Sequence, residues 1–172
     1  MEQNNLERSA QTMDANNNNL IEQITTIDDS NIRDFVDKYC AVKKRNKLPE
    51  DLKKIPIGNW DVSKVKNMSN LFFNKKDFNE PLNNWNVSNV TNMFGMFNHC
   101  SNFNQDLSNW NVSSVIDMAS MFTNATLFNS PLNWGSYTSN VNDMSSMFYN
   151  AETFSQDISN WSINSCQVFN SF

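Results

Sequence analysis

Residues 85–97, WNVSNVTNMFGMF, decide the fold, because the same pattern recurs with small changes over the last two thirds of the 172-residue chain. The pattern is W-x-V-x2-V-x2-M-x2-[ML]-F-x5-F-x3-[LI], and the fourth copy carries two extra residues after its Trp. A period of about 25 residues is typical of repeat proteins, whose copies bury a core only when they stack. We number the copies 1 to 5, the last a half-copy, by their first residues: Trp60, Trp85, Trp110, Trp134 and Trp161.

Each copy is predicted to contain one short strand and one helical turn. A Trp and the second residue after it, such as Trp85 and Val87, would share one side of a strand. Apolar residues at three-residue steps, such as Val90, Met93 and Met96, favour one side of a short helical or 3₁₀ turn. We therefore expect an α/β repeat solenoid, leucine-rich-repeat-like, of about four and a half copies. Its parallel strands are expected near residues 59–63, 84–88, 109–113, 133–137 and 160–163.

The first third of the chain differs from the repeats. Its start is polar and rich in asparagine, which is typical of a disordered arm. From Ile32 to Val42 the apolar residues follow helical spacing, with Asp29 or Ser30 as the expected N-cap. An open end of a stack exposes its core, so this helix is expected to serve as an N-terminal cap. The expected divisions are a disordered arm over 1–27, a helical cap over 28–58 and the repeat solenoid over 59–172.

Charge and composition exclude several functions. The net charge is -5, and no Lys or Arg follows Lys76, so a basic surface for nucleic acid is missing from more than half of the chain. The single His excludes catalytic or metal sites that need two. The three cysteines lie far apart and have no metal-ligand spacing, and the aligned carboxylates Asp117 and Asp143 are too few for Ca²⁺. We therefore expect no enzymatic activity, no catalytic residue, no cofactor and no metal.

Membrane insertion and secretion are not expected either. No apolar run approaches the roughly 18 residues that a membrane-spanning helix needs. The first residues, MEQNN, lack the basic and apolar regions of a secretory signal. An intracellular or virion-associated protein is therefore favoured over a secreted one.

Two segments resemble a known repeat family. Residues 103–113, FNQDLSNWNVS, and 141–148, VNDMSSMF, are similar to the bacterial surface protein 26-residue repeat of the BspA-like leucine-rich repeat group. The resemblance covers about residues 57–172. It implies a right-handed solenoid that binds other molecules rather than transforming them. Bacterial members are often surface proteins linked to adhesion, and members also occur in protists and large DNA viruses.

Candidate binding residues flank each Trp. If Trp and the second residue after it face inward, their neighbours face outward, and stacked strands ~4.8 Å apart would align these neighbours in polar columns. One interpretation is a face that binds a protein or a glycan. The other is an amide ladder, in which stacked Asn side chains bond each other. The candidate ligand-binding residues are Asp61, Asn84, Asn86, Ser88, Asn109, Asn111 and Ser113.

The end of the sequence suggests a second class of function. Phe169 and Phe172 follow the last Trp without a polar cap, which favours self-association through this repeat end. The alternative to a binding module is therefore a structural or assembly component of a virion or surface layer. Such a component would be held through its repeat ends and its N-terminal arm.

Overall fold

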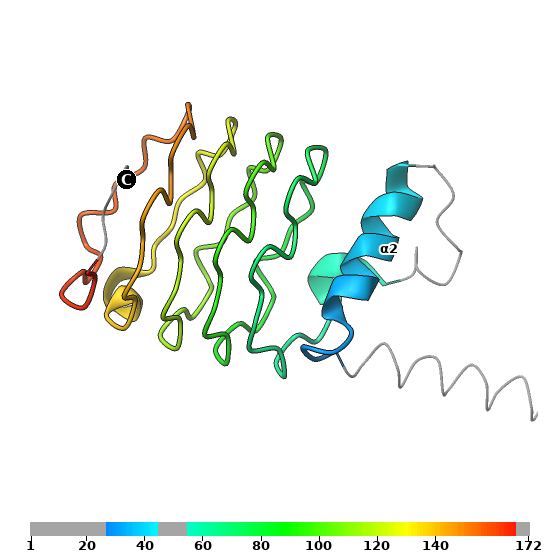
Figure 1. Ribbon diagram of the computed structural model, residues 1–172, viewed down its shortest axis with the longest axis horizontal. Coiled ribbons are helices and arrows are strands. Elements are labelled where there is room, and N and C mark those ends of the chain that lie inside the picture. Colours follow the sequence, from blue (N-terminus) through cyan, green and yellow to red (C-terminus); the bar gives the residue numbers. More distant parts are fainter. Residues whose placement is uncertain (1–26, 45–54, 168–172) are drawn as a thin grey trace, which may run out of the picture.

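The computed structural model describes residues 27–44 and 55–167, in which the copies lie side by side as a stack (Figure 1). A helix, α2 (Ile32–Lys44), lies at one end of the stack, and the last described residues lie at the other. The predicted arm, apart from Ile27, lies outside the described residues, as do Phe169 and Phe172. No helix among the described residues is long and apolar enough to cross a membrane.

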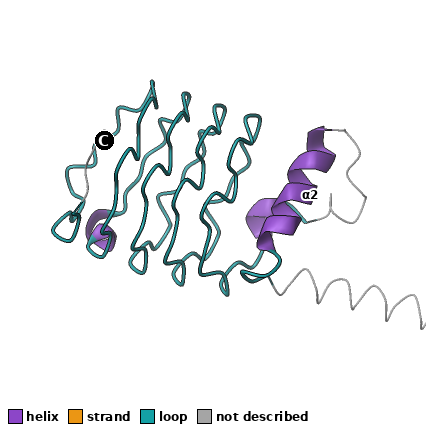
Figure 2. Ribbon diagram, viewed as in Figure 1, coloured by secondary structure: helices purple, strands orange, loops and turns teal. Residues whose placement is uncertain are grey.

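Regular secondary structure is sparse in this part of the chain (Figure 2). Besides α2 it contains two 3₁₀ helices, η1 (Ile57–Asn59) and η2 (Gly135–Thr138). The β pairing within the described ranges consists of isolated parallel bridges that join Asn67 to Asn92, Asn92 to Asp117 and Asp117 to Asp143. The predicted strands near 59–63, 84–88, 109–113, 133–137 and 160–163 are therefore wrong, and turns replace the predicted helical turn of copies 1 to 4.

The strand prediction failed because each Trp-x-Val segment turns almost at once. In copy 1 the Asp61 carboxylate accepts a hydrogen bond from the Ser63 backbone N–H at 3.0 Å. The Val65 N–H then donates to the Val62 carbonyl at 2.9 Å. A short polar side chain that bonds the backbone two residues ahead favours a turn over a strand.

After each Trp-x-Val segment, backbone hydrogen bonds join neighbouring copies in a ladder, and the backbone of this segment is not that of a regular β-strand. In copy 2 the N–H groups of Met93, Gly95 and Phe97 each donate to a carbonyl of copy 3 at 2.9 Å. Two residues in each of copies 1 to 4 interrupt this segment with φ between 54° and 60°, so a continuous strand cannot form. Asn and Gly tolerate this left-handed conformation best, and five of the eight positions hold one of them. The eight residues are Asn70, Asn74, Gly95, His99, Ser120, Asn124, Ser146 and Asn150.

Two columns of stacked phenylalanines fill the core. Within each column the rings of neighbouring copies are nearly parallel, with centroids 5.4–5.6 Å apart in the first column and 5.9–6.0 Å apart in the second. The two columns also touch inside each copy, where Phe97 and Phe103 are 4.0 Å apart. The first column is Phe72, Phe97, Phe122 and Phe148, and the second is Phe78, Phe103, Phe128 and Phe154.

Each Trp from copy 2 onward ties its copy to the preceding one. The Trp110 indole N–H donates to the Leu82 carbonyl at 2.9 Å, and that carbonyl also accepts the Trp85 backbone N–H. The same contact recurs at Trp85, Trp134 and Trp161. The Trp60 indole N–H is buried and has no hydrogen-bond partner in the described part of the chain. Copy 1 has no preceding copy to supply that carbonyl.

Helix α2 covers this end of the stack and confirms the helix predicted from spacing. Phe35 and Tyr39 pack edge-on against the Trp60 ring, with centroids 6.4 and 5.8 Å away. The predicted N-cap, Asp29 or Ser30, is wrong: the Asp28 carbonyl accepts the Ile32 N–H at 3.1 Å, and the Asp28 carboxylate accepts the Ser30 N–H at 2.9 Å. The Asp29 carboxylate instead accepts the backbone N–H groups of Lys66 and Asn67, each at 2.8 Å. In copy 2, the backbone N–H of the residue aligned with Lys66 donates to a carbonyl of copy 1. Copy 1 has no preceding copy, and the Asp29 carboxylate takes the place of that carbonyl.

Candidate functional site

The predicted binding residues lie on the surface, but several of them hold turns. Asp61, Asn86 and Asn111 are exposed, and each accepts a hydrogen bond from the N–H of the Ser two residues later. The bonds from Ser63 hold the pKa of Asp61 below its ordinary value. Ser88 and Ser113 are half-buried. These side chains therefore shape the backbone while presenting a polar surface.

A ladder of Asn side chains exists, but it does not lie at the Asn before each Trp, and its side chains bond the backbone of the next copy and not each other. Asn84 and Asn109 are exposed, and no bond joins their side chains within the described residues. The ladder follows the second phenylalanine column. There the side-chain oxygens of Asn79, Asn104 and Asn129 accept the next copy's backbone N–H at 2.8–2.9 Å. The Phe-Asn pair repeated every 25 residues is the sequence signal that identifies these positions.

The stack is hollowed on a stretch of copies 3 to 5 that the sequence analysis did not single out. A groove of about 580 Å³ lies there, and its first lining residue, Ser114, directly follows the predicted binding residue Ser113 of copy 3. Every side chain that lines it is uncharged, and all but one are polar. We call it the amide groove, and it is lined by Ser114, Ile116, Asn140, Asn142, Asn164, Ser165 and Gln167.

Backbone bonds between copies fix the amide groove. The Asn142 N–H donates to the Ile116 carbonyl at 2.7 Å, and the Gln167 N–H donates to the Asn142 carbonyl at 2.8 Å. The Asn140 side-chain nitrogen donates to the Ser113 carbonyl at 2.7 Å, which holds this amide in place. No described residue bonds the Asn140 side-chain oxygen or the Asn142 side-chain amide. The groove therefore contains one amide, that of Asn140, held by a hydrogen bond, and a second, that of Asn142, that no described residue engages.

Acidic residues lie directly beside the groove. Asp117 and Asp143 follow Ile116 and Asn142 in sequence, and their side chains accept the N–H groups of Ala119 and Ser145 at 2.9 and 2.8 Å. Burial raises the pKa of Asp117, and the nearby Asp143 raises it further. Across the described ranges no group of three or more His, Cys, Asp or Glu side chains could hold a metal ion.

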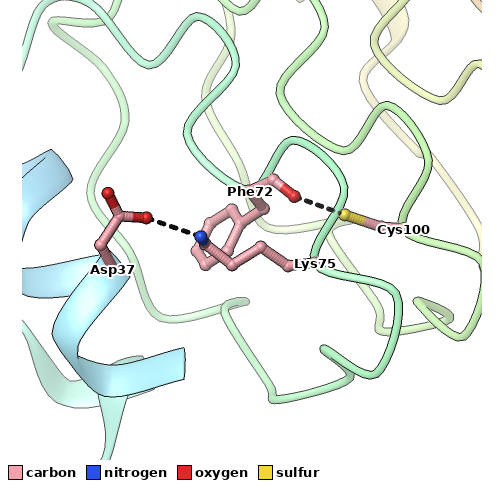
Figure 3. Close-up of polar contacts among 4 residues, drawn as sticks. All are labelled: Asp37, Phe72, Lys75 and Cys100. Carbon is pink, nitrogen blue, oxygen red and sulfur yellow. Dashed lines mark hydrogen bonds and ion pairs between the residues drawn. The ribbon is translucent and has the colours of Figure 1, made fainter. Parts of the chain in front are cut away.

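A second hollow, of about 510 Å³, separates α2 from copy 1. The Lys75 ammonium pairs across it with the Asp37 carboxylate at 2.6 Å, as Figure 3 shows. Cys40 also lines this hollow. Because the ion pair joins the helix to the first copy, we interpret this hollow as part of the contact between the two.

Cys100 lies deep in the core, at the position that Lys75 occupies in copy 1. It is fully buried, the aligned Ala125 and Ala151 are also buried, and its thiol donates to the Phe72 carbonyl at 2.9 Å (Figure 3). Burial raises the pKa of the Cys100 thiol from the ordinary 9.0 to about 12. The thiol is therefore protonated in the folded protein at any physiological pH.

This raised pKa makes stability depend on pH. Above pH 9.0 the unfolded chain releases the Cys100 proton, while the folded protein keeps it up to about pH 12. The free energy of unfolding should therefore fall as the pH rises through this window. Urea unfolding at pH 8 and pH 10 measures the loss, which should be smaller in Cys100→Ala. Ala125 and Ala151 show that alanine fits this position. Equal losses in both proteins would contradict the prediction.

The stacked copies and their aromatic columns define a repeat protein. The sequence model of the family described as "Mycoplasma protein of unknown function, DUF285" matches residues 40–161, with a second match over residues 133–172. The chain therefore belongs to the DUF285 family, whose matches span all five copies. Comparison with curated proteins and with solved structures gives no significant match.

Proposed function

We propose that this protein is a non-enzymatic binding module that recognises a protein or glycan partner through one surface. This surface carries the amide groove and the Asx turns, in which Asp61, Asn86 and Asn111 bond the Ser two residues later. In this proposal the stack is a right-handed, leucine-rich-repeat-like solenoid of the BspA-like group. Helix α2 is its N-terminal cap. The protein needs no cofactor or metal and does not engage nucleic acid.

The observation that carries the proposal is the amide groove. Ligand sites in proteins are usually concave and have volumes of roughly 300–1,000 Å³. The groove falls in this range, and its floor is fixed by backbone bonds between three copies. The predicted residue Asn111 lies in copy 3, three residues before the lining residue Ser114, and Asn86 is its equivalent in copy 2. A partner larger than the groove would extend over them.

A cross-linked pull-down from the source organism, read by mass spectrometry, tests the proposal. The variant Asn86→Arg/Asn111→Arg places two bulky charges on the proposed face, and we expect it to lose one dominant partner. The matched control is Asn102→Arg/Leu127→Arg, because both residues are exposed and lie in another column of copies 2 and 3. We expect the control to retain the partner. A partner that both variants retain would contradict recognition through this face.

Assembly through the repeat ends is the second candidate. Ile163 belongs to the last described copy and is 47% exposed, whereas the matching Val62, Val87 and Val112 are buried. A partner that persists in Asn86→Arg/Asn111→Arg but is lost in Ile163→Asp would favour assembly. Recovery of the protein alone with wild type would favour self-association, which sedimentation of the same two variants would then locate.

A further inference from the structure

We infer that the amide groove binds an uncharged, hydroxyl-rich carbohydrate. This inference rests on the proposed function and names the ligand class of the same face. It follows from three properties of the groove: the hydrogen-bonding groups that it presents, its one exposed aliphatic side chain, and its charge.

The hydrogen-bonding groups match hydroxyls. The bond from the Asn140 side-chain nitrogen to the Ser113 carbonyl fixes the orientation of this amide. Its side-chain oxygen can therefore accept a hydrogen bond from a ligand. The Asn142 side-chain amide can both donate and accept. A sugar hydroxyl also does both, so neighbouring hydroxyls on one ring can satisfy both amides. A simple anion offers only acceptors and would leave the Asn140 oxygen unpaired.

The exposed aliphatic side chain of the groove, that of Ile116, matches the apolar C–H surface of a sugar ring. Ile116 lines the groove and is 52% exposed, although the residues on both sides of it in sequence are more buried. The same column holds Lys66, Thr91, Asn142 and Gln167 in the other copies, so an apolar residue here is not required by the repeat. The C–H groups of a sugar ring can pack on Ile116 while its hydroxyls reach the amides.

The charge around the groove favours a neutral ligand. None of the lining side chains is charged, and no Lys or Arg follows Lys76 in the sequence. Asp117 and Asp143 lie directly beside the lining residues Ile116 and Asn142. An acidic glycan or a phosphorylated ligand would find no cation among the lining side chains to compensate its charge. A volume of about 580 Å³ accommodates a short oligosaccharide.

The test is calorimetric titration of the full chain with maltotriose, cellotriose, xylotriose and N-acetylated chitotriose, and with an oligogalacturonide as the acidic comparison. We expect at least one neutral oligosaccharide to bind, and the acidic one not to bind. Ile116→Arg should weaken that binding at least about tenfold. Asn142→Leu, which keeps the size of the side chain and removes its amide, should weaken it similarly.

The matched control is Thr91→Arg. Thr91 occupies the Ile116 column in copy 2, is exposed and does not line the groove. It should change the affinity less than about twofold. Thermal unfolding of the three variants identifies any that fail to fold, and the remaining groove variant still decides the result. Equal weakening by Thr91→Arg and Ile116→Arg would overturn the inference.

The two proposals fail in different ways. If no neutral oligosaccharide binds while Asn86→Arg/Asn111→Arg still loses its partner, the carbohydrate inference is overturned and the partner is a protein. If an oligosaccharide binds in the groove but the pull-down partners do not depend on the face, the inference stands and the proposed recognition of a larger partner does not. Preferential binding of the acidic oligosaccharide would overturn the charge argument and the inference with it.

Discussion

Replacement of Phe97 by alanine is expected to lower the free energy of unfolding by about 3–5 kcal/mol, the usual cost of deleting a buried phenylalanine ring. Phe97 is fully buried in the middle of the first aromatic column. Its ring stacks on Phe72 and Phe122 in the neighbouring copies and on Phe103 in its own. The change therefore removes contacts within copy 2 and on both sides of it. Urea unfolding followed by tryptophan fluorescence measures the loss.

Phe73→Ala is the matched control. Phe73 directly follows a residue of the same column but is 49% exposed, so its truncation should cost less than about 1 kcal/mol. Because a small domain is stable by only about 5–15 kcal/mol, Phe97→Ala should also lower the melting temperature clearly. Equal effects of Phe73→Ala and Phe97→Ala would show that the aromatic columns do not carry the stability of the stack.

Trp110→Phe is expected to cost about 1–3 kcal/mol, because it removes a buried hydrogen bond and part of a buried ring. The lost bond runs from the indole N–H to the Leu82 carbonyl of the preceding copy. Trp60→Phe should cost at least about 1 kcal/mol less, since the Trp60 N–H is buried without a partner in the described part of the chain. For Trp60, the substitution removes a donor whose burial is not compensated.

The same urea titrations compare the two Trp variants directly. Trp134→Phe serves as a second interior example, because its indole N–H donates to the Leu107 carbonyl at 3.0 Å. It should resemble Trp110→Phe and not Trp60→Phe. If Trp60→Phe is the most damaging of the three, the bonds between copies are not what distinguishes the interior tryptophans.

The repeat and its core were predictable from the sequence, but its local conformation was not. Apolar residues at fixed places in each period, such as Val62, Met93 and Phe122, are buried as a repeat requires. The strands were not predictable from alternation, because the Asx turn at Asp61 and left-handed residues such as Asn70 break the chain into short segments. The abundance of Asn signals such turns, yet the period alone does not say which Asn adopts the left-handed conformation.

The candidate site was predicted less well than the core. The residues flanking each Trp are on the surface as expected, and their hydrogen bonds to Ser63, Ser88 and Ser113 could have been anticipated from the Asx-x-Ser spacing. The amide groove could not, because it combines side chains from three copies whose spacing depends on the two extra residues of copy 4. Ile116 was the available signal, as an aliphatic residue in a column that elsewhere holds Lys, Thr, Asn and Gln.

The hydrogen bonds of the Asp29 carboxylate bear on how the number of copies can change in evolution. Its two bonds go to backbone N–H groups, and the matching N–H of the next copy donates in the same direction. These two donors are backbone groups, so they do not depend on the side chains of Lys66 and Asn67. The other contacts of α2 with the stack come from side chains of copy 1, among them Trp60 and Lys75. Duplication or loss of a copy after copy 1 therefore leaves this junction chemically intact. The array can lengthen or shorten in steps of one period, and its exposed side chains can vary, without any change at the end that contacts α2.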